Sequence, residues 1–275
     1  MCPFGGRLMD GRSTGAVATL VCHCLLVETP QHGLVLVDTG LGLGDVEHTV
    51  PRLSAFYLRL LRPQLRIEQT ARRQIEALGF AAADVRHIVL THLDFDHAGG
   101  LEDFPQARVH VLGRELDAAR RWRHGFVARR RYRPDQWDEI TRWHGYTAGQ
   151  GERWFGFACV RELTGLPPEL LLVPLRGHTE GHSGVAIGTG DGWLLHAGDA
   201  YFHNDEITAP HYRCPPGLRG YQRLMEIDRQ ARLTNQHRLR RLAADASARV
   251  RIISGHDALE FDACAHGRAL PVVRR

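Results

Sequence analysis

The amino-acid sequence predicts an α/β fold. Apolar runs of strand length recur along the chain, and several of them end in a turn that contains glycine. Longer stretches with helical periodicity lie between these runs. Strands in two groups with helices between them are typical of domains in which helices cover sheets. The composition, 43% hydrophobic and 24% charged, is that of an ordinary globular protein.

The first half of the chain is predicted to hold a strand pair, two further strands and two helices. A turn at residues 31–33 joins the strand pair, and Gly79 is a typical helix stop. The predicted strands are 16–27, 34–37, 88–90 and 108–112, and the predicted helices are 69–78 and 115–123.

The second half begins with an aromatic and basic segment, around residues 120–160, that gives no clear pattern and is interpreted as an insertion. Regular apolar runs return after it. The predicted strands are 170–175, 183–188, 193–197 and 250–254, and residues 220–242 are predicted to form one or two helices.

We expect a single domain over residues 1–275, because the segments that carry candidate ligands span residues 92–256 without a linker. No apolar stretch approaches the roughly 20 residues that cross a bilayer, and the N-terminus lacks a secretory pattern. Six scattered cysteines without a second closely spaced pair favour a reduced, cytoplasmic protein. Cys22 and Cys24 are predicted to be small buried side chains on one face of a strand.

Residues 91–100, Thr-His-Leu-Asp-Phe-Asp-His-Ala-Gly-Gly, contain four potential metal ligands. On an extended segment alternate residues point the same way, so His92, Asp94 and Asp96 can converge on one point. His97 can then reach a second point nearby. Imidazoles and carboxylates packed this tightly need a positive charge between them, and two divalent metals would supply it. The alternative is an ordinary polar turn in which Asp96 caps a helix.

Three later segments repeat the same pattern of apolar strand, glycine and ligand-type side chain. They deliver His178 after residues 170–175, Asp199 after 193–197 and His256 after 250–254. Sites in α/β proteins are commonly built at strand ends. The repetition favours a shared metal site over four unrelated turns.

These motifs resemble the metallo-β-lactamase superfamily of dinuclear hydrolases. The family pattern His-x-His-x-Asp-His matches residues 92–97, with later counterparts in His178, Asp199 and His256. Asp38 resembles the Asp-Thr-Gly turn that ends an early strand of the family. The resemblance covers about residues 15–260 and implies an αββα sandwich of two mixed β-sheets with outer helices. The context of residues 91–100 is most similar to the lactonase-like branch.

The resemblance also implies a ligand set. His92, Asp94 and His178 would hold one metal ion, Asp96, His97 and His256 would hold the other, and Asp199 would bridge them. The implied mechanism is attack by a metal-bridging hydroxide on an ester, lactone or thioester carbonyl. Asp96, Asp199 and Tyr201 are the candidate catalytic residues, with Tyr201 as a hydrogen-bond donor to an oxyanion.

Asp94 departs from the family pattern, which usually has histidine at this position. A carboxylate adds a negative charge and a harder donor, so zinc is favoured but iron and manganese stay open. The departure motivates one alternative, a di-iron oxidoreductase of the same fold. A second alternative is a ligand-binding member without turnover.

Other residues near the motifs have structural interpretations as well as functional ones. Asp38 is predicted to orient a ligand, and His182 to make a structural hydrogen bond. His203 is a second candidate donor beside Tyr201.

All 35 basic residues are arginine, and the net charge is +4. The densest arginine cluster, residues 120–133, has three interpretations: a solvated surface segment, a cap over the substrate, or a nucleic-acid contact. We expect a small-molecule substrate and neither a nucleic-acid nor a membrane partner. Tryptophan and tyrosine in the insertion leave room for a homodimer.

Overall fold

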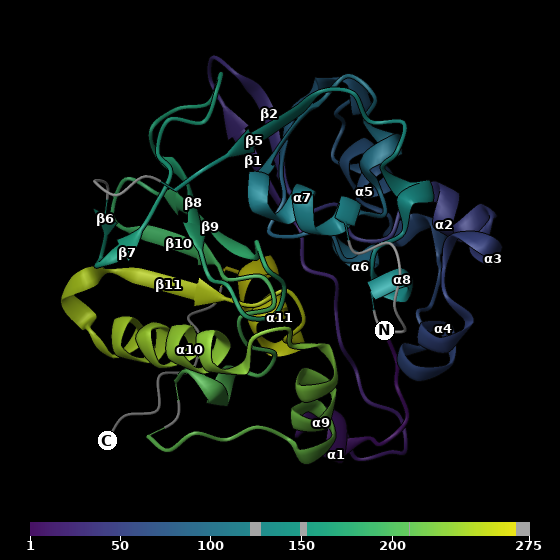
Figure 1. Cartoon of the computed structure of the whole chain (residues 1–275), viewed down its shortest axis with the longest axis vertical. Coiled ribbons are helices and arrows are strands. Elements are labelled where there is room, and N and C mark those ends of the chain that lie inside the picture. Colours follow the sequence, from purple (N-terminus) through teal and green to yellow (C-terminus); the bar gives the residue numbers. More distant parts are fainter. Residues whose placement is uncertain (122–127, 149–152, 209, 268–275) are drawn as a thin grey trace.

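The computed structural model describes residues 1–121, 128–148, 153–208 and 210–267 (Figure 1). Its first sheet has five strands in the order β1-β2-β3-β4-β5. The β1–β2 pair is antiparallel, and the pairs from β2 to β5 are parallel, so the sheet is mixed. The strands are β1 (Leu25–Thr29), β2 (Gly33–Val37), β3 (Val85–Val89), β4 (Arg108–Leu112) and β5 (Trp143–Tyr146).

The second sheet has four strands in the order β11-β10-β9-β8. Its β10–β11 pair is parallel and its other two pairs are antiparallel, so it is also mixed. The strands are β8 (Leu170–Pro174), β9 (Ser183–Gly188), β10 (Trp193–His196) and β11 (Val250–Ile253). A separate two-stranded ribbon is formed by β6 (Arg153–Trp154) and β7 (Phe157–Ala158).

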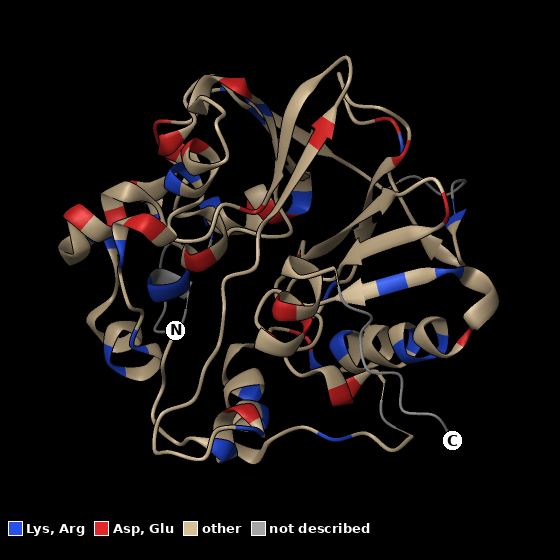
Figure 2. Cartoon of the chain, turned by 180° about the vertical axis from the view of Figure 1, so that it is seen from behind, with Lys and Arg blue, Asp and Glu red and all other residues tan. Residues whose placement is uncertain are grey.

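Helices cover the outer faces of the two sheets (Figure 1). Acidic and basic residues are interspersed over both helical layers, as Figure 2 shows. No helix in the described part of the chain combines the length and apolar character that a membrane span needs. The α-helices are α1 (Arg7–Asp10), α2 (Leu43–Glu47), α3 (Thr49–Arg52), α4 (Ala55–Leu61), α5 (Ala71–Ala77), α6 (Phe95–Ala98), α7 (Gly113–Arg121), α8 (Ala128–Arg131), α9 (Pro216–Met225), α10 (Arg229–Ala244) and α11 (Ala258–Ala265). The short 3₁₀ helices are η1 (Ile67–Gln69), η2 (Ala82–Asp84), η3 (Leu101–Asp103), η4 (Pro134–Gln136), η5 (Asn204–Glu206) and η6 (Ala246–Ala248).

The layers follow from side-chain alternation along the strands. Val35 and Val37 of β2 share a buried cluster with Leu170 and Leu172 of β8, which places them between the sheets. The intervening residues of β2 pack outward with Ile75 of α5. The intervening residues of β8 pack against α10, which lies along β11 in Figure 1. The predicted αββα sandwich is therefore confirmed.

Most predicted strands are present, and residues 108–112 and 183–188 form strands with the predicted bounds. The prediction is wrong for residues 16–24, which precede β1. This stretch makes single backbone hydrogen bonds instead of a ladder: Ala18 and Leu20 donate to the N-terminal residues, and His23 donates to Gly255. An extended apolar segment need not have a strand beside it to pair with.

The segment around residues 120–160 is predicted to be an insertion, but it contains β5, which is an edge strand of the first sheet. Its residues 122–127 and 149–152 lie outside the described ranges, including part of the arginine cluster 120–133 and the predicted end of the helix at residue 123. The predicted helical region 220–242 is two helices, α9 and α10, and the Asp228 side chain caps the second.

The strand directions explain where the site lies. Strands β2 and β3 are parallel, so their carboxyl ends lie at the same edge of the first sheet. Because β9 is antiparallel to both β8 and β10, those two strands run in the same direction as β11. The carboxyl ends of β8, β10 and β11 therefore share one edge of the second sheet.

Candidate metal centre

The structure brings all seven predicted metal ligands together, and all are buried. Two overlapping groups have their ligand atoms within 4.8 Å of one another. The first group consists of His92, Asp94, His178 and Asp199, and the second group consists of His97, Asp199 and His256. Asp199 belongs to both. The buried ligands are His92, Asp94, Asp96, His97, His178, Asp199 and His256.

A tight turn after β3 separates the two groups. The Asp94 carbonyl accepts a hydrogen bond from the His97 backbone N–H (2.9 Å), which starts helix α6. Asp94 makes no side-chain cap, and Asp96 lies inside the helix. The alternative in which Asp96 caps a helix is therefore wrong. His92 and Asp94 lie before the helix, and His97 lies within it.

Glycine allows Asp199 to lie between the groups. Gly198 follows β10 with φ +52°, and a Cβ there would lie 2.6 Å from the His182 Nε2 atom. That nitrogen accepts a hydrogen bond from the Asp199 backbone N–H (2.8 Å). A side chain at position 198 would displace the histidine that fixes Asp199.

In the second group, hydrogen bonds hold the two imidazole rings so that their Nε2 atoms face Asp199. The His97 Nδ1 donates to Asp38 Oδ2 (2.8 Å), and the His256 Nδ1 donates to the Val21 carbonyl (2.7 Å). Both Nε2 atoms face Asp199 Oδ1, at 3.3 and 3.1 Å. Fixing one imidazole nitrogen in this way leaves the other as a metal ligand.

Asp199 Oδ1 is buried without a hydrogen-bond partner among the described residues. A buried carboxylate oxygen between two imidazole nitrogens is stabilised by a positive charge, which a divalent ion held by these residues would supply. The donors of the second group therefore fit a divalent metal ion. Burial opposes ionisation of Asp199, but His256, His97 and His178 hold its pKa well below the usual range.

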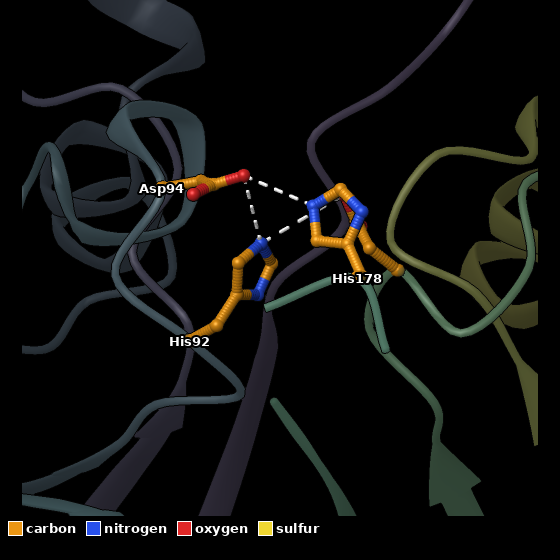
Figure 3. A group of neighbouring side chains, drawn as sticks. His92, Asp94 and His178 are labelled. Carbon is orange, nitrogen blue, oxygen red and sulfur yellow. Dashed lines mark hydrogen bonds and ion pairs between the residues drawn. The ribbon is translucent and has the colours of Figure 1, made fainter. Parts of the chain in front are cut away.

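Figure 3 shows three members of the first group, His92, Asp94 and His178, pointing toward one another. Asp94 Oδ2 lies 3.4 Å from the His92 Nε2 and 3.0 Å from the His178 Nε2. Asp199 Oδ2 lies 3.2 Å from the same atom of His178. The His92 Nε2 is buried and has no hydrogen-bond partner in the described structure. Burial lowers the pKa of His178 to about 4, which keeps its imidazole neutral.

Sequence reasoning missed Arg131, which contacts the first group. Its side chain is buried, and its Nε and Nη2 atoms donate to the two carboxylate oxygens of Asp94 at 2.7 and 2.6 Å. Burial alone would raise the pKa of Asp94, but Arg131 and His92 hold it well below its usual range. Arg131 stands within the arginine cluster 120–133, and no spacing in the sequence distinguishes it from its neighbours.

Cys22 is a second residue that the sequence did not assign to the site. Its sulfur belongs to a further group of candidate ligand atoms with Asp96 and His256. The prediction that Cys22 only packs on a strand face is wrong, because no strand forms there. Burial raises the pKa of its thiol to about 12.

Tyr201 is not aimed at the ligands. Its hydroxyl is buried and donates to Glu260, with oxygen–oxygen distances of 2.8 and 3.0 Å. With its hydroxyl engaged by Glu260, the role of Tyr201 as a donor to an oxyanion stays a prediction. The His203 Nδ1 accepts a hydrogen bond from the Asp205 backbone N–H (3.2 Å) at the start of η5.

Comparisons with known proteins agree with the geometry. The family model for the metallo-beta-lactamase superfamily matches residues 17–256. A probable metallo-hydrolase of Mycobacterium tuberculosis is 41% identical over 240 residues, which are 86% of this chain and 75% of that protein. An N-acyl homoserine lactonase of Bacillus thuringiensis is 29% identical over 123 residues, which are 42% of this chain and 49% of that protein.

Solved structures show the same fold at lower identity. An N-acyl homoserine lactone hydrolase, with N-hexanoyl-L-homoserine bound at its catalytic metal centre, has a TM-score of 0.68 and 21% identity, covering 96% of this chain and 92% of that chain. The dizinc quorum-quenching lactonase AidC has a TM-score of 0.53 and 17% identity, covering 88% of this chain and 74% of that chain. The strand-end ligands, the αββα layers and the family match lead to one conclusion: this chain is a metallohydrolase that belongs to the metallo-β-lactamase superfamily.

Proposed function

We propose that the protein is a dinuclear metal-dependent hydrolase that cleaves the ester, lactone or thioester bond of a small molecule. The observation that carries this proposal is Asp199. Its two carboxylate oxygens face different groups of buried ligand atoms, Oδ2 facing the first and Oδ1 the second. A carboxylate in this position can bridge two cations.

When bound, the ions would supply a hydroxide nucleophile near neutral pH and polarise the substrate carbonyl. The protein's own residues orient and protect this chemistry. Asp38 and the Val21 carbonyl fix the rings of His97 and His256. Asp96 lies beside His256 at 3.6 Å and can take up the proton of the attacking water and return it to the leaving oxygen.

A cavity beside the centre supports a small, partly apolar substrate. Its volume is about 520 Å³, within the range of small-molecule sites. Cys22 lines this cavity and also belongs to the ligand group with Asp96, so the two spaces adjoin. Much of the remaining wall is aliphatic, with Leu20, Leu26 and Leu41 among the lining residues. This lining suits an acyl chain, in keeping with the acylated product in the lactone hydrolase structure.

Zinc is the metal that we propose. The sulfur of Cys22 near Asp96 and His256 adds a soft donor to a set of imidazoles, and zinc accepts both. The argument for a di-iron site depends on the carboxylate of Asp94 as a metal ligand. Both oxygens of that carboxylate pair with Arg131, so this argument is weaker.

The test combines metal content with turnover. Zinc-loaded protein and its His256→Ala variant would be compared on a panel of esters, lactones and thioesters, with zinc per chain measured on the same samples. We expect hydrolysis by the parent and loss of both zinc and turnover in the variant. His48→Ala, at an exposed position, is the matched control. Hydrolysis that persists in zinc-free His256→Ala would overturn the proposal.

A further inference from the structure

The two ligand groups differ in one respect: a guanidinium lies in the first. Arg131 has five N–H groups, and each has an acceptor within reach. Two donate to Asp94, and a third approaches the His178 Nε2 at 2.9 Å. The Nη1 atom donates to the carbonyls of Met225 (2.7 Å) and His178 (3.3 Å). Arg131 therefore has no donor left for a substrate and is part of the site's framework.

This arrangement engages ligand atoms that a metal ion would need. Both carboxylate oxygens of Asp94 accept from Arg131. The His178 Nε2 lies 2.9 Å from the Arg131 Nη2 and 3.0 Å from Asp94 Oδ2. In the tautomer that would bind a metal ion, its single lone pair faces the guanidinium. Of the first group's donors, only the His92 Nε2 and Asp199 Oδ2 are free of the guanidinium.

The second group has no such competitor. In the described part of the chain, the ion pairs of Asp199 are all with histidines. The Nδ1 atoms of His97 and His256 are held by Asp38 and Val21, and their Nε2 atoms face Asp199. An ion can enter this group without displacing a charged side chain.

Electrostatic repulsion should make the first group bind a divalent ion much more weakly than the second group. A divalent ion in the first group would lie within a few ångströms of a buried positive charge, where repulsion is weakly screened. Entry would also require Arg131 to leave Asp94, and breaking a buried, bidentate ion pair is costly.

We propose that Arg131 takes the place of the first metal ion. The protein then holds one divalent ion tightly in the second group, and a second ion binds weakly, only after the guanidinium has withdrawn. Asp94 and Arg131 act as one unit, because the arginine neutralises the charge that this aspartate adds to the family's ligand pattern. The inference rests on the proposed dinuclear function and adds that its two metal positions are unequal, because the second ion binds only when the guanidinium has left Asp94.

The experiment compares zinc binding by the parent, Arg131→Met and the double variant Asp94→His/Arg131→Met. The double variant removes both charges together, so it leaves no unpaired buried charge and should fold even if the single variant does not. Arg130→Met, one residue earlier on the same helix, is the control. Zinc per chain after dialysis and competition with a chromophoric chelator give stoichiometry and affinity without any activity measurement. Circular dichroism and thermal unfolding verify the fold of each variant.

We expect one tight zinc per chain in the parent and in Arg130→Met, with the second ion bound at least about tenfold more weakly. The double variant should hold two ions, with a second affinity about tenfold higher than in the parent. Two equally tight ions in the parent would overturn this inference and leave the proposed function standing. No zinc in the parent at any loading would overturn both.

Discussion

Asp38 and His97 are joined by a 2.8 Å hydrogen bond between Oδ2 and Nδ1, although 59 residues separate them in the chain. The same carboxylate accepts from the backbone N–H and hydroxyl of Thr91. Asp38 follows β2 with a positive φ of 54°, which turns its side chain back toward the loop after β3. One buried carboxylate thus ties two strand ends to a metal-ligand ring.

Asp38→Asn should weaken metal binding without changing the fold. Asparagine tolerates the positive φ, but its amide cannot accept from both Thr91 and the His97 ring as the carboxylate does. We expect zinc affinity to fall by about 10- to 100-fold, measured by chelator competition. Asp84→Asn, at the exposed end of η2, is the control. Equal affinities in the two variants would show that Asp38 does not orient a ligand.

His182 is expected to be structural. Its Nδ1 donates to the Leu175 carbonyl (2.9 Å), and its Nε2 accepts from the Asp199 backbone. Neither nitrogen is left for a metal. His182→Ala should therefore lower the free energy of unfolding by about 1–3 kcal/mol, because the Asp199 N–H would be buried without a partner. Denaturant unfolding of the zinc-free protein measures this effect. Unchanged stability with complete loss of zinc would instead make His182 a ligand.

The ligand residues could be predicted because a short local sequence pattern precedes each of them. His178, Asp199 and His256 all follow an apolar strand and a glycine, and parallel strands bring such ends to one edge. The arrangement of the layers is harder to predict, because alternation along a strand indicates two buried faces without showing which element covers each. The αββα arrangement is implied by the family resemblance alone.

Arg131, Cys22 and Tyr201 could not be placed for physical reasons. Arg131 reaches Asp94 across 37 residues and Met225 across 94, and no local pattern encodes such contacts. Cys22 lies on a stretch whose apolar run suggested a strand that does not form. Tyr201 was expected near the ligands because it follows Asp199 by two residues. The chain leaves extended geometry there, and the hydroxyl turns to Glu260 instead.

Tyr201→Phe distinguishes a structural hydrogen bond to Glu260 from donation to an oxyanion. Removing a hydroxyl that donates only to Glu260 should cost about 1 kcal/mol of stability and change kcat less than about twofold. An oxyanion donor would instead lower kcat by about 100-fold or more. Steady-state kinetics on the best substrate of the panel, with thermal unfolding of the same samples, decides between them. A large fall in kcat at unchanged Tm would restore Tyr201 to the reaction.

The last prediction concerns a histidine pair away from the ligand groups. His110 of β4 is fully buried, with its Nε2 2.9 Å from the His87 Nδ1 and its Nδ1 2.8 Å from the Tyr146 hydroxyl. Burial, with the neighbouring His87, lowers the pKa of His110 to about 3, from an ordinary value of 6.5. The folded protein therefore keeps this imidazole neutral in mild acid.

Stability should consequently fall as the pH decreases from about 6.5 toward 3. In that window the unfolded chain binds a proton at His110 that the folded chain does not, so acid favours unfolding by up to about 1.4 kcal/mol per pH unit from this residue. His110→Gln keeps hydrogen-bonding groups beside Tyr146 but removes the titration, so its unfolding free energy should depend less steeply on pH. Urea unfolding at pH 6.5, 5.5 and 4.5 measures the slopes, with exposed His48→Gln as the control. If His110→Gln and His48→Gln lose stability with acid at the same rate as the parent, the buried histidine is not the source of the acid sensitivity. The other buried histidines would then have to account for it.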